Sequence, residues 1–211
     1  RKNPKRLFKR LWQTLIPIFA YIFSVVLDKF TGKLKNETQA RFRAKELTNL
    51  LVELGPAFVK AGQALSTRPD IIPVVLLEEL SQLQDQLPGF SGDKAMELIE
   101  EDLDKNIKDI FLEIDKEPIS AASLGQVHKA ILKGGDIVAV KVQRPGLREQ
   151  ITLDLYIVRN IAIWLKNNIG LIRSDLVALI DELGKRVFEE MDYINEAENA
   201  EKFRNMHQKN I

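Results

Sequence analysis

One lysine in the middle of a β-branched run is the side chain of this sequence best suited to chemistry. The run is Ile137-Val138-Ala139-Val140-Lys141-Val142. Such a run predicts a strand with at least one buried face, and a buried ammonium group is costly unless it faces an anion. We therefore expect Lys141 to contact a carboxylate, a phosphate or both. The alternative is a lysine on the exposed edge of a solvated strand.

A turn of small residues precedes this strand. It contains Ser120, Ala121, Ala122, Ser123 and Gly125. Phosphate binding requires close approach of the backbone and accessible N–H groups, which small side chains permit. Because only Gly125 is a glycine and alanine disfavours positive φ, the turn is expected to be stiffer than a glycine-rich one. The alternative is a plain β-turn.

Two further segments carry charged or polar residues at suggestive spacing. Lys60 and Gln63 are three apart, so they share a helix face, and Gly62 between them lets another backbone approach. The alternative there is an ordinary small-residue helix contact. Glu190 and Asp192 are paired carboxylates of the kind that can hold Mg²⁺ beside a phosphate. From the residues alone, Glu190 and Asp192 are better explained as ordinary surface carboxylates.

Taken in order, these segments resemble a known family. The set K-x-G-Q, A-A-S-x-G-Q-V-H, V-A-V-K-V-Q-x-P-G, E-x-D-Y and E-A is similar to that of the UbiB (aarF) family of atypical, protein-kinase-like proteins, over about residues 45–205. The V-A-V-K order is also that of the protein-kinase strand whose lysine binds nucleotide phosphates. One departure is Ser120, which stands where many relatives carry another alanine.

The resemblance implies roles for individual residues. Lys141 would hold the phosphates of ATP or ADP, with Ala121, Ala122, Ser123 and Gly125 covering them. Glu196 would orient Lys141, and Glu190 is the second choice; on one continuous helix the two would point about 120° apart.

The other implied roles concern the metal and access to the site. Glu190 and Asp192 would bind Mg²⁺. Lys60 and Gln63 would lie over the active site and gate it, which would disfavour ordinary protein kinase activity. His128 is expected to be a structural, hydrogen-bonded histidine.

Composition narrows the function further. The 211 residues carry a net charge of +1, so the overall charge of the protein does not favour binding to nucleic acid. The sequence has no cysteine, which excludes disulfides and thiol catalysis, and its two histidines disfavour a histidine metal site. No H-x-D or D-F-G motif follows the lysine strand, so we expect a fragment without the second lobe, unable by itself to transfer a phosphoryl group.

The N-terminal residues suggest that this part of the protein contacts a membrane. Six basic side chains lie among the first ten residues, and residues 11–27 are nearly uncharged and apolar. Basic residues beside such a helix suit an anionic membrane surface, and the length is at the short edge for a span. A helix buried against the protein and a secretory signal are the alternatives. The predicted location is membrane-associated, at the cytoplasmic face in bacteria or in a plastid or mitochondrion.

The predicted fold is α+β, with a helical N-terminal extension and a protein-kinase-like small lobe with an antiparallel sheet and a helical insert. The predicted parts are a membrane-proximal segment (1–35), the helical extension with K-x-G-Q (36–107) and the small lobe (108–211). We expect helices over 37–54, 56–67, 73–86, 91–103, 147–168 and 174–205, and strands over 111–114, 127–133 and 137–143.

The predicted function is that of an atypical kinase-like ATP-binding protein. When full length it would act as an ATPase or phosphotransferase and support the synthesis of isoprenoid quinones, or of related lipids, at a membrane. Its partners would be an adenine nucleotide, a membrane lipid or lipid-like quinone precursor, and a lipid-biosynthesis complex, without nucleic acid. The alternative is a non-catalytic membrane-associated scaffold or lipid-binding module of such a complex.

Overall fold

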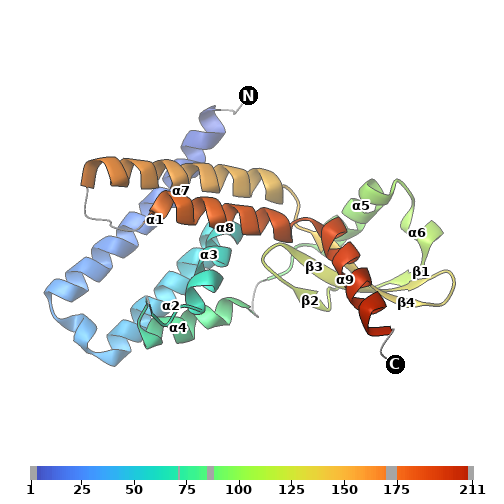
Figure 1. Cartoon of the computed structure of the whole chain (residues 1–211), viewed down its shortest axis with the longest axis horizontal. Helices are drawn as coiled ribbons and strands as arrows, with labels where there is room; N and C mark the ends of the chain where they lie inside the picture. The colour runs from blue at the N-terminus through green and yellow to red at the C-terminus, as the bar shows by residue number, and fades with distance from the viewer. Residues whose placement is uncertain (1–3, 71, 85–87, 170–174, 209–211) are drawn as a thin grey trace. The chain divides into compact units, whose positions relative to one another are not determined.

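The structure, a computed structural model, describes residues 4–70, 72–84, 88–169 and 175–208. The chain divides into two compact units, Arg1–Asp154 and Leu155–Ile211, and the boundary falls inside one long helix. The first unit holds a group of helices and an antiparallel sheet, and the second is helical (Figure 1). The predicted α+β fold class is confirmed.

The first unit begins with a group of helices. These are α1 (Pro4–Phe30), the 3₁₀ turn η1 (Lys33–Lys35), α2 (Glu37–Leu54), α3 (Pro56–Ser66), α4 (Val74–Ser81) and the 3₁₀ turn η2 (Gln82–Gln84). Local signals set their ends: Asn36 accepts the N–H of Thr38 at the start of α2, and Pro56 occupies the first turn of α3. Val59, Leu80 and Leu83 form the apolar core of α3, α4 and η2.

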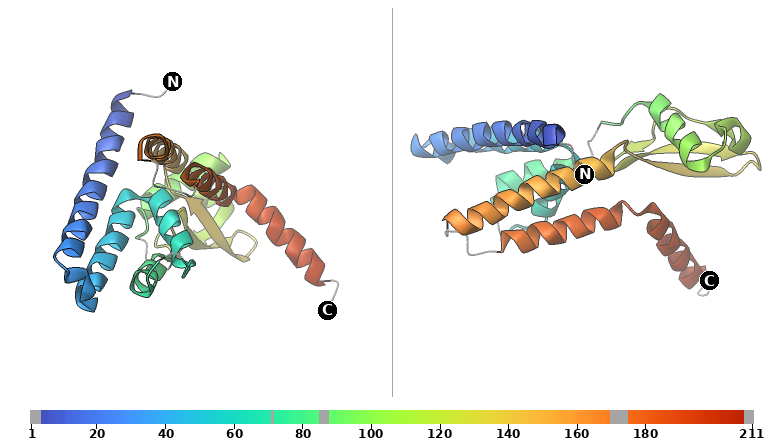
Figure 2. Two further views of the ribbon diagram at one scale, coloured as in Figure 1. Left: turned by 60° about the vertical axis from the view of Figure 1, so that its left-hand side comes forward. Right: turned by 90° about the horizontal axis from the view of Figure 1, so that it is seen from above.

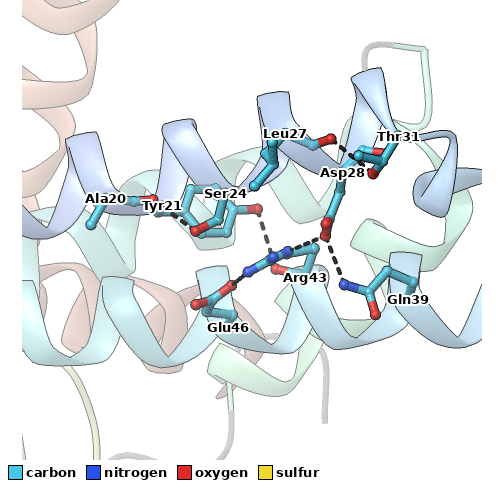
Figure 3. A network of polar contacts seen from close by, with 9 residues as sticks. All are labelled: Ala20, Tyr21, Ser24, Leu27, Asp28, Thr31, Gln39, Arg43 and Glu46. Carbon is cyan, nitrogen blue, oxygen red and sulfur yellow. Dashed lines mark hydrogen bonds and ion pairs between the residues drawn. The ribbon is translucent and has the colours of Figure 1, made fainter.

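A polar network joins α1 to α2, which lie side by side (Figures 2 and 3). The buried carboxylate of Asp28 accepts hydrogen bonds from Arg43 Nε and Gln39 Nε2, both at 2.7 Å. Arg43 also donates to Glu46 at 2.6 Å, and its backbone carbonyl accepts the hydroxyl of Tyr21 at 3.2 Å. The Arg43 guanidinium, followed by the Gln39 amide, lowers the pKa of Asp28.

A second ion pair fastens the other half of α1. Arg10 contacts Asp154 at 2.6 and 2.8 Å and also donates to the carbonyl of Leu54, at the end of α2. Asp154 is 1% exposed, and its burial raises the pKa of the carboxyl group against the lowering effect of Arg10. One arginine therefore links α1 both to the end of α2 and to the helix that follows the sheet.

The sheet follows two short helices, α5 (Gly92–Leu103) and α6 (Ile107–Ile110). Its strands are β1 (Phe111–Ile114), β2 (Ser120–Ala121), β3 (Gly125–Leu132) and β4 (Ile137–Gln143). All pairings are antiparallel: β1 and β2 pair with β3, and β4 pairs with β3 along its length. The turn between β3 and β4 places Gly135 at φ 92°, which glycine adopts at little cost.

The two faces of this sheet differ. Val138, Val140 and Val142 alternate along β4 and pack with Ala95 and Ile99 of α5, so one face is the core of the small lobe. The intervening β4 residues, Ile137, Ala139 and Lys141, point to the opposite face and are exposed. This second face is called the open face below.

A buried hydrogen-bond network explains the G-Q-V-H sequence. The Gln126 amide accepts from Phe90 N–H at 2.8 Å and donates to Phe90 O at 3.2 Å and to His128 Nε2 at 3.0 Å. His128 Nδ1 lies 2.8 Å from the carbonyl of Asp115. Both side chains are at most 1% exposed, so His128 is structural, as expected, with its Nδ1–H donating to that carbonyl.

The second unit is formed by the rest of α7 (Leu147–Ile169), by α8 (Leu176–Glu190) and by α9 (Tyr193–Gln208). Arg159 of α7 pairs with Asp181 of α8 at 2.8 Å, and Gly184 lets α8 approach Leu155. Asp192 Oδ1 accepts the N–H of Asn195 at 3.0 Å and so caps α9.

Most predicted elements are confirmed, and three need correction. The helix over 73–86 is wrong in extent, since α4 ends at Ser81, η2 follows it, and residues 85 and 86 lie outside the described part. The strand over 127–133 runs from Gly125 to Leu132 and is preceded by the short β2, which was not predicted. The single helix over 174–205 is wrong, because Asp192 starts a new helix after α8; residue 174 lies outside the described part.

Candidate functional site

The turn of small residues is a tight β-hairpin connection. Ser120 and Ala121 belong to β2, Gly125 begins β3, and the Ala122 N–H donates to the carbonyl of Gly125 at 2.8 Å. Ser123 and Leu124 at its tip are buried. The segment from Ser120 to Gly125 is called the Ala-rich loop below, and the phosphate-covering role remains a prediction for it.

Lys141 lies on the open face, close in register to this loop. Val127 of β3 is opposite Lys141, and Gly125 is opposite Gln143. Because cross-strand partners share a face, Lys141 projects from the open face two residues along β4 from the partner of Gly125. Lys141 is exposed, so the expectation that its ammonium group is buried was wrong, because the face that it occupies is not the core. Its contact with a carboxylate or a phosphate remains a prediction.

Lys60, Gly62 and Gln63 lie on α3. Gln63 Nε2 donates to the carbonyl of Leu83 at 2.8 Å and so ties α3 to η2. A Cβ at Gly62 would lie 2.6 Å from Leu83 Cδ1 and 2.8 Å from Leu51 Cδ1. The glycine is therefore needed for close packing of α2, α3 and η2, and the gating role of Lys60 and Gln63 remains a prediction.

The acidic residues lie in the second unit. Glu190 is the last residue of α8, Asp192 is the N-cap of α9, and Glu196 is in the first turn of α9. Glu190 and Glu196 are thus on different helices, and the 120° argument, which assumed one helix, does not apply. The structure describes each unit by itself, so the pairing of Lys141 with Glu196 stays a prediction.

Metal binding rests on a small donor set. Among the described residues no group of three or more histidine, cysteine, aspartate or glutamate side chains is placed to hold a metal ion. Glu190 and Asp192 are two carboxylates, and two protein carboxylates with phosphate and water oxygens are a usual environment for Mg²⁺. The residue types therefore fit the ion.

One residue at the loop escaped sequence reasoning. Arg144 follows β4 directly, and its guanidinium donates to the carbonyls of Ala122 and Pro88. The sequence signal was an arginine between the lysine strand and the Pro145-Gly146 turn, which carries no obvious chemistry. Next to the loop lies a cleft of about 270 Å³, lined by Val52, Gly55, Pro56, Val59, Pro88, Phe90, Ser123, Arg144, Pro145, Leu147 and Gln150.

Comparison with known proteins gives one family match. Residues 82–211, more than half of the chain, match the ABC1 atypical kinase-like domain. An uncharacterized protein of Synechocystis sp. is 50% identical over 203 residues, which are 96% of this chain and 30% of that protein. An uncharacterized aarF domain-containing protein kinase of Arabidopsis thaliana, described as chloroplastic, is 48% identical over 98% of this chain and 30% of its own length.

Two further similarities complete the comparison. Protein ACTIVITY OF BC1 COMPLEX KINASE 3, chloroplastic, of Arabidopsis thaliana is 43% identical over 98% of this chain and 29% of its own length. The Rv3197–erythromycin complex from Mycobacterium tuberculosis aligns with a TM-score of 0.49 and 31% identity, over 84% of this chain and 44% of that chain. The chain spans about a third of the length of the curated relatives that it matches.

Proposed function

Because the chain belongs to the ABC1 atypical kinase-like family, also called the UbiB (aarF) family, we propose that it is the nucleotide-binding part of an atypical ATPase or phosphotransferase. The nucleotide is ATP or ADP with Mg²⁺. The whole protein supports the synthesis of isoprenoid quinones or related lipids at a membrane. The observation that carries the proposal is the register that brings Lys141 and the Ala-rich loop to one end of the sheet.

In this proposal Lys141 neutralises phosphate charge from the open face. An ammonium group is a compact point charge that suits phosphate oxygens. The small side chains of Ala121, Ala122, Ser123 and Gly125 let the loop backbone come close to the phosphates. Glu196 orients Lys141, and Glu190 and Asp192 hold Mg²⁺, which supplies charge neutralisation at the phosphates when bound.

The helical extension restricts access to the site. Gln63 is fixed by Leu83, and Gly62 packs against two leucines, so α3 is a rigid element within the extension. A rigid helix that carries Lys60 is suited to exclude a peptide substrate from the site. We infer that a transferred phosphoryl group goes to an acceptor that is not a protein.

The nucleotide part is tested by binding of ATP and ADP in Mg²⁺, measured by calorimetry. Loss of one charge-assisted contact is expected to weaken binding about 10- to 100-fold in Lys141→Ala. Lys129→Ala is the matched control: Lys129 is also exposed on the open face, but its partner is Ala139, farther from the loop. Equal effects of the two substitutions, or no binding by the folded wild type, would contradict the proposal.

The membrane part rests on α1. Helix Pro4–Phe30 is, by length and composition, apolar enough to cross a membrane, and 11% of its apolar window is buried. Large apolar side chains recur every three or four residues on its exposed side: Phe8, Trp12, Ile16, Phe19, Phe23, Val26, Leu27 and Phe30. They form a continuous apolar stripe, flanked by basic residues at both ends of the helix.

The contacts of α1 favour an interfacial position over a span. Its other side carries Asp28 and Tyr21, which bond to Arg43 of the polar helix α2 (Figure 3). Charged groups and a polar partner helix are costly inside a bilayer. We therefore propose that the stripe lies in the surface of an anionic membrane, with Lys9, Lys29, Lys33 and Lys35 near the headgroups.

Vesicle sedimentation tests the membrane part. Wild type is expected to bind vesicles that contain anionic lipid and to bind neutral vesicles more weakly. Phe19→Ser with Phe23→Ser should reduce binding, whereas Leu112→Ser, an exposed leucine on β1, should not. Phosphate release from ATP by the full-length protein on the same vesicles distinguishes the enzyme from the alternative, a non-catalytic scaffold, which would bind vesicles and release none.

A further inference from the structure

The most constrained contact that no role yet explains is made by Arg144. Its Nε and one terminal nitrogen donate to the carbonyl of Ala122 at 3.1 and 2.9 Å, and the same terminal nitrogen donates to Pro88 O at 2.7 Å. Its backbone N–H donates to Leu124 O at 3.0 Å. One residue therefore holds carbonyls on both sides of Ser123, at the tip of the Ala-rich loop.

Arg144 reaches the loop from the core side of the sheet. Val140 and Val142 face the core, and Arg144 continues this alternation. Its guanidinium carbon lies 5.9 Å from the ring of Phe90, which packs against the same core. The carbonyl of Ala122 is thus pulled toward the core side, whereas Lys141 points to the open face.

The geometry of the peptide bond gives this contact a consequence. In a trans peptide the C=O of one residue and the N–H of the next point in opposite directions. With the Ala122 carbonyl held by Arg144, the N–H of Ser123 points away from that guanidinium. A backbone N–H and a lysine ammonium group on the same end of a sheet are donors of the kind that bind phosphate oxygens.

We propose that Arg144 is a positioning residue for phosphate binding, which acts through the Ala122–Ser123 peptide. The proposal rests on the nucleotide-binding function proposed above. Arginine suits this role because its planar fork can hold two carbonyls in fixed directions, which an ammonium group does less well. The contacts of Arg144 also explain how an alanine-rich loop, stiffer than a glycine-rich one, keeps one defined peptide orientation.

The test compares ATP with adenosine in Mg²⁺, by calorimetry on wild type, Arg144→Met and Arg144→Lys. Arg144→Met is expected to weaken the binding of ATP about tenfold, the effect of one lost hydrogen bond, and to change the affinity for adenosine by less than about twofold. Arg144→Lys should lie between. Arg68→Met is the control and should match wild type, because Arg68 is exposed and pairs with Asp70 two residues away.

Each outcome decides the matter. Equal weakening of ATP and adenosine would mean a merely structural role, and unchanged ATP affinity in Arg144→Met would overturn the proposal outright. If Arg144→Met loses its helical circular dichroism, the ATP-to-adenosine ratio of Arg144→Lys decides instead. If wild type does not bind ATP, the proposed function itself is overturned. If wild type binds ATP and substitution of Arg144 has no effect, only the role of Arg144 is overturned.

Discussion

Substitution of Gly62 by alanine tests the packing of the helical extension. Gly62 is buried in α3, where alanine is the better helix former. Space works against the change, because the new Cβ would lie 2.6 Å from Leu83 Cδ1, 2.8 Å from Leu51 Cδ1 and 3.5 Å from Leu80 Cδ2. Both near contacts are shorter than carbon atoms tolerate, so side chains or backbone must shift.

The two effects can be weighed. The gain in helix propensity is about 1 kcal/mol. Overpacking costs about 1–3 kcal/mol, and the upper part of that range applies because both Leu51 and Leu83 must move and Leu83 is only 2% exposed. We therefore expect Gly62→Ala to lower the free energy of unfolding by about 1–2 kcal/mol, the difference between the two effects.

The assay is urea unfolding followed by circular dichroism. Gly184→Ala is the matched control: it is also a buried glycine within a helix, but its Cβ would meet a single side chain, Leu155, at 3.1 Å. We expect its unfolding free energy to change by less than about 0.5 kcal/mol. Leu83→Val in the Gly62→Ala background should recover part of the loss, by about 1 kcal/mol. A Gly62→Ala variant as stable as wild type would refute the packing argument.

Three further substitutions test polar contacts. Because Arg43 lowers the pKa of Asp28, the pair stabilises the fold above the unfolded-state pKa and this contribution is lost as the pH falls through the lowered value. Asp28→Asn should thus lower the thermal unfolding temperature by its full amount at neutral pH and by less in acid. An effect that does not change with pH would contradict this. Asp154→Ala leaves Arg10 without its carboxylate and should cost about 3 kcal/mol in urea titrations, unless Arg10→Met accompanies it. Gln126→Glu removes two buried donors and should cost about 2 kcal/mol in the same assay.

Local signals determined much of the fold. The ends of α2 and α3 follow from Asn36, Gly55 and Pro56, which act within one turn of the helix that they begin or end. The alternation of valines in β4 indicated one buried face. Family motifs, whose order can be read directly from the sequence, were enough to identify the ABC1 family.

Two errors came from features that local patterns do not encode. Lys141 was expected to be buried because its neighbours are apolar, but the face that a strand buries depends on what packs against it, and α5 packs on the opposite face. The break between α8 and α9 has no glycine or proline. Its signal was Asp192 at a capping position, which in an acidic helical stretch looks like any other surface carboxylate.

The sequence alone thus determined the family, the α+β class and the helices and strands whose ends depend on neighbouring residues. Tertiary structure alone decided which distant groups meet: Asp28 with Arg43, Arg10 with Asp154, and Arg144 with the Ala122 carbonyl. The physical reason is that caps and periodicity act within a few residues. A hydrogen bond across 22 or 144 residues exists only after the intervening chain has packed.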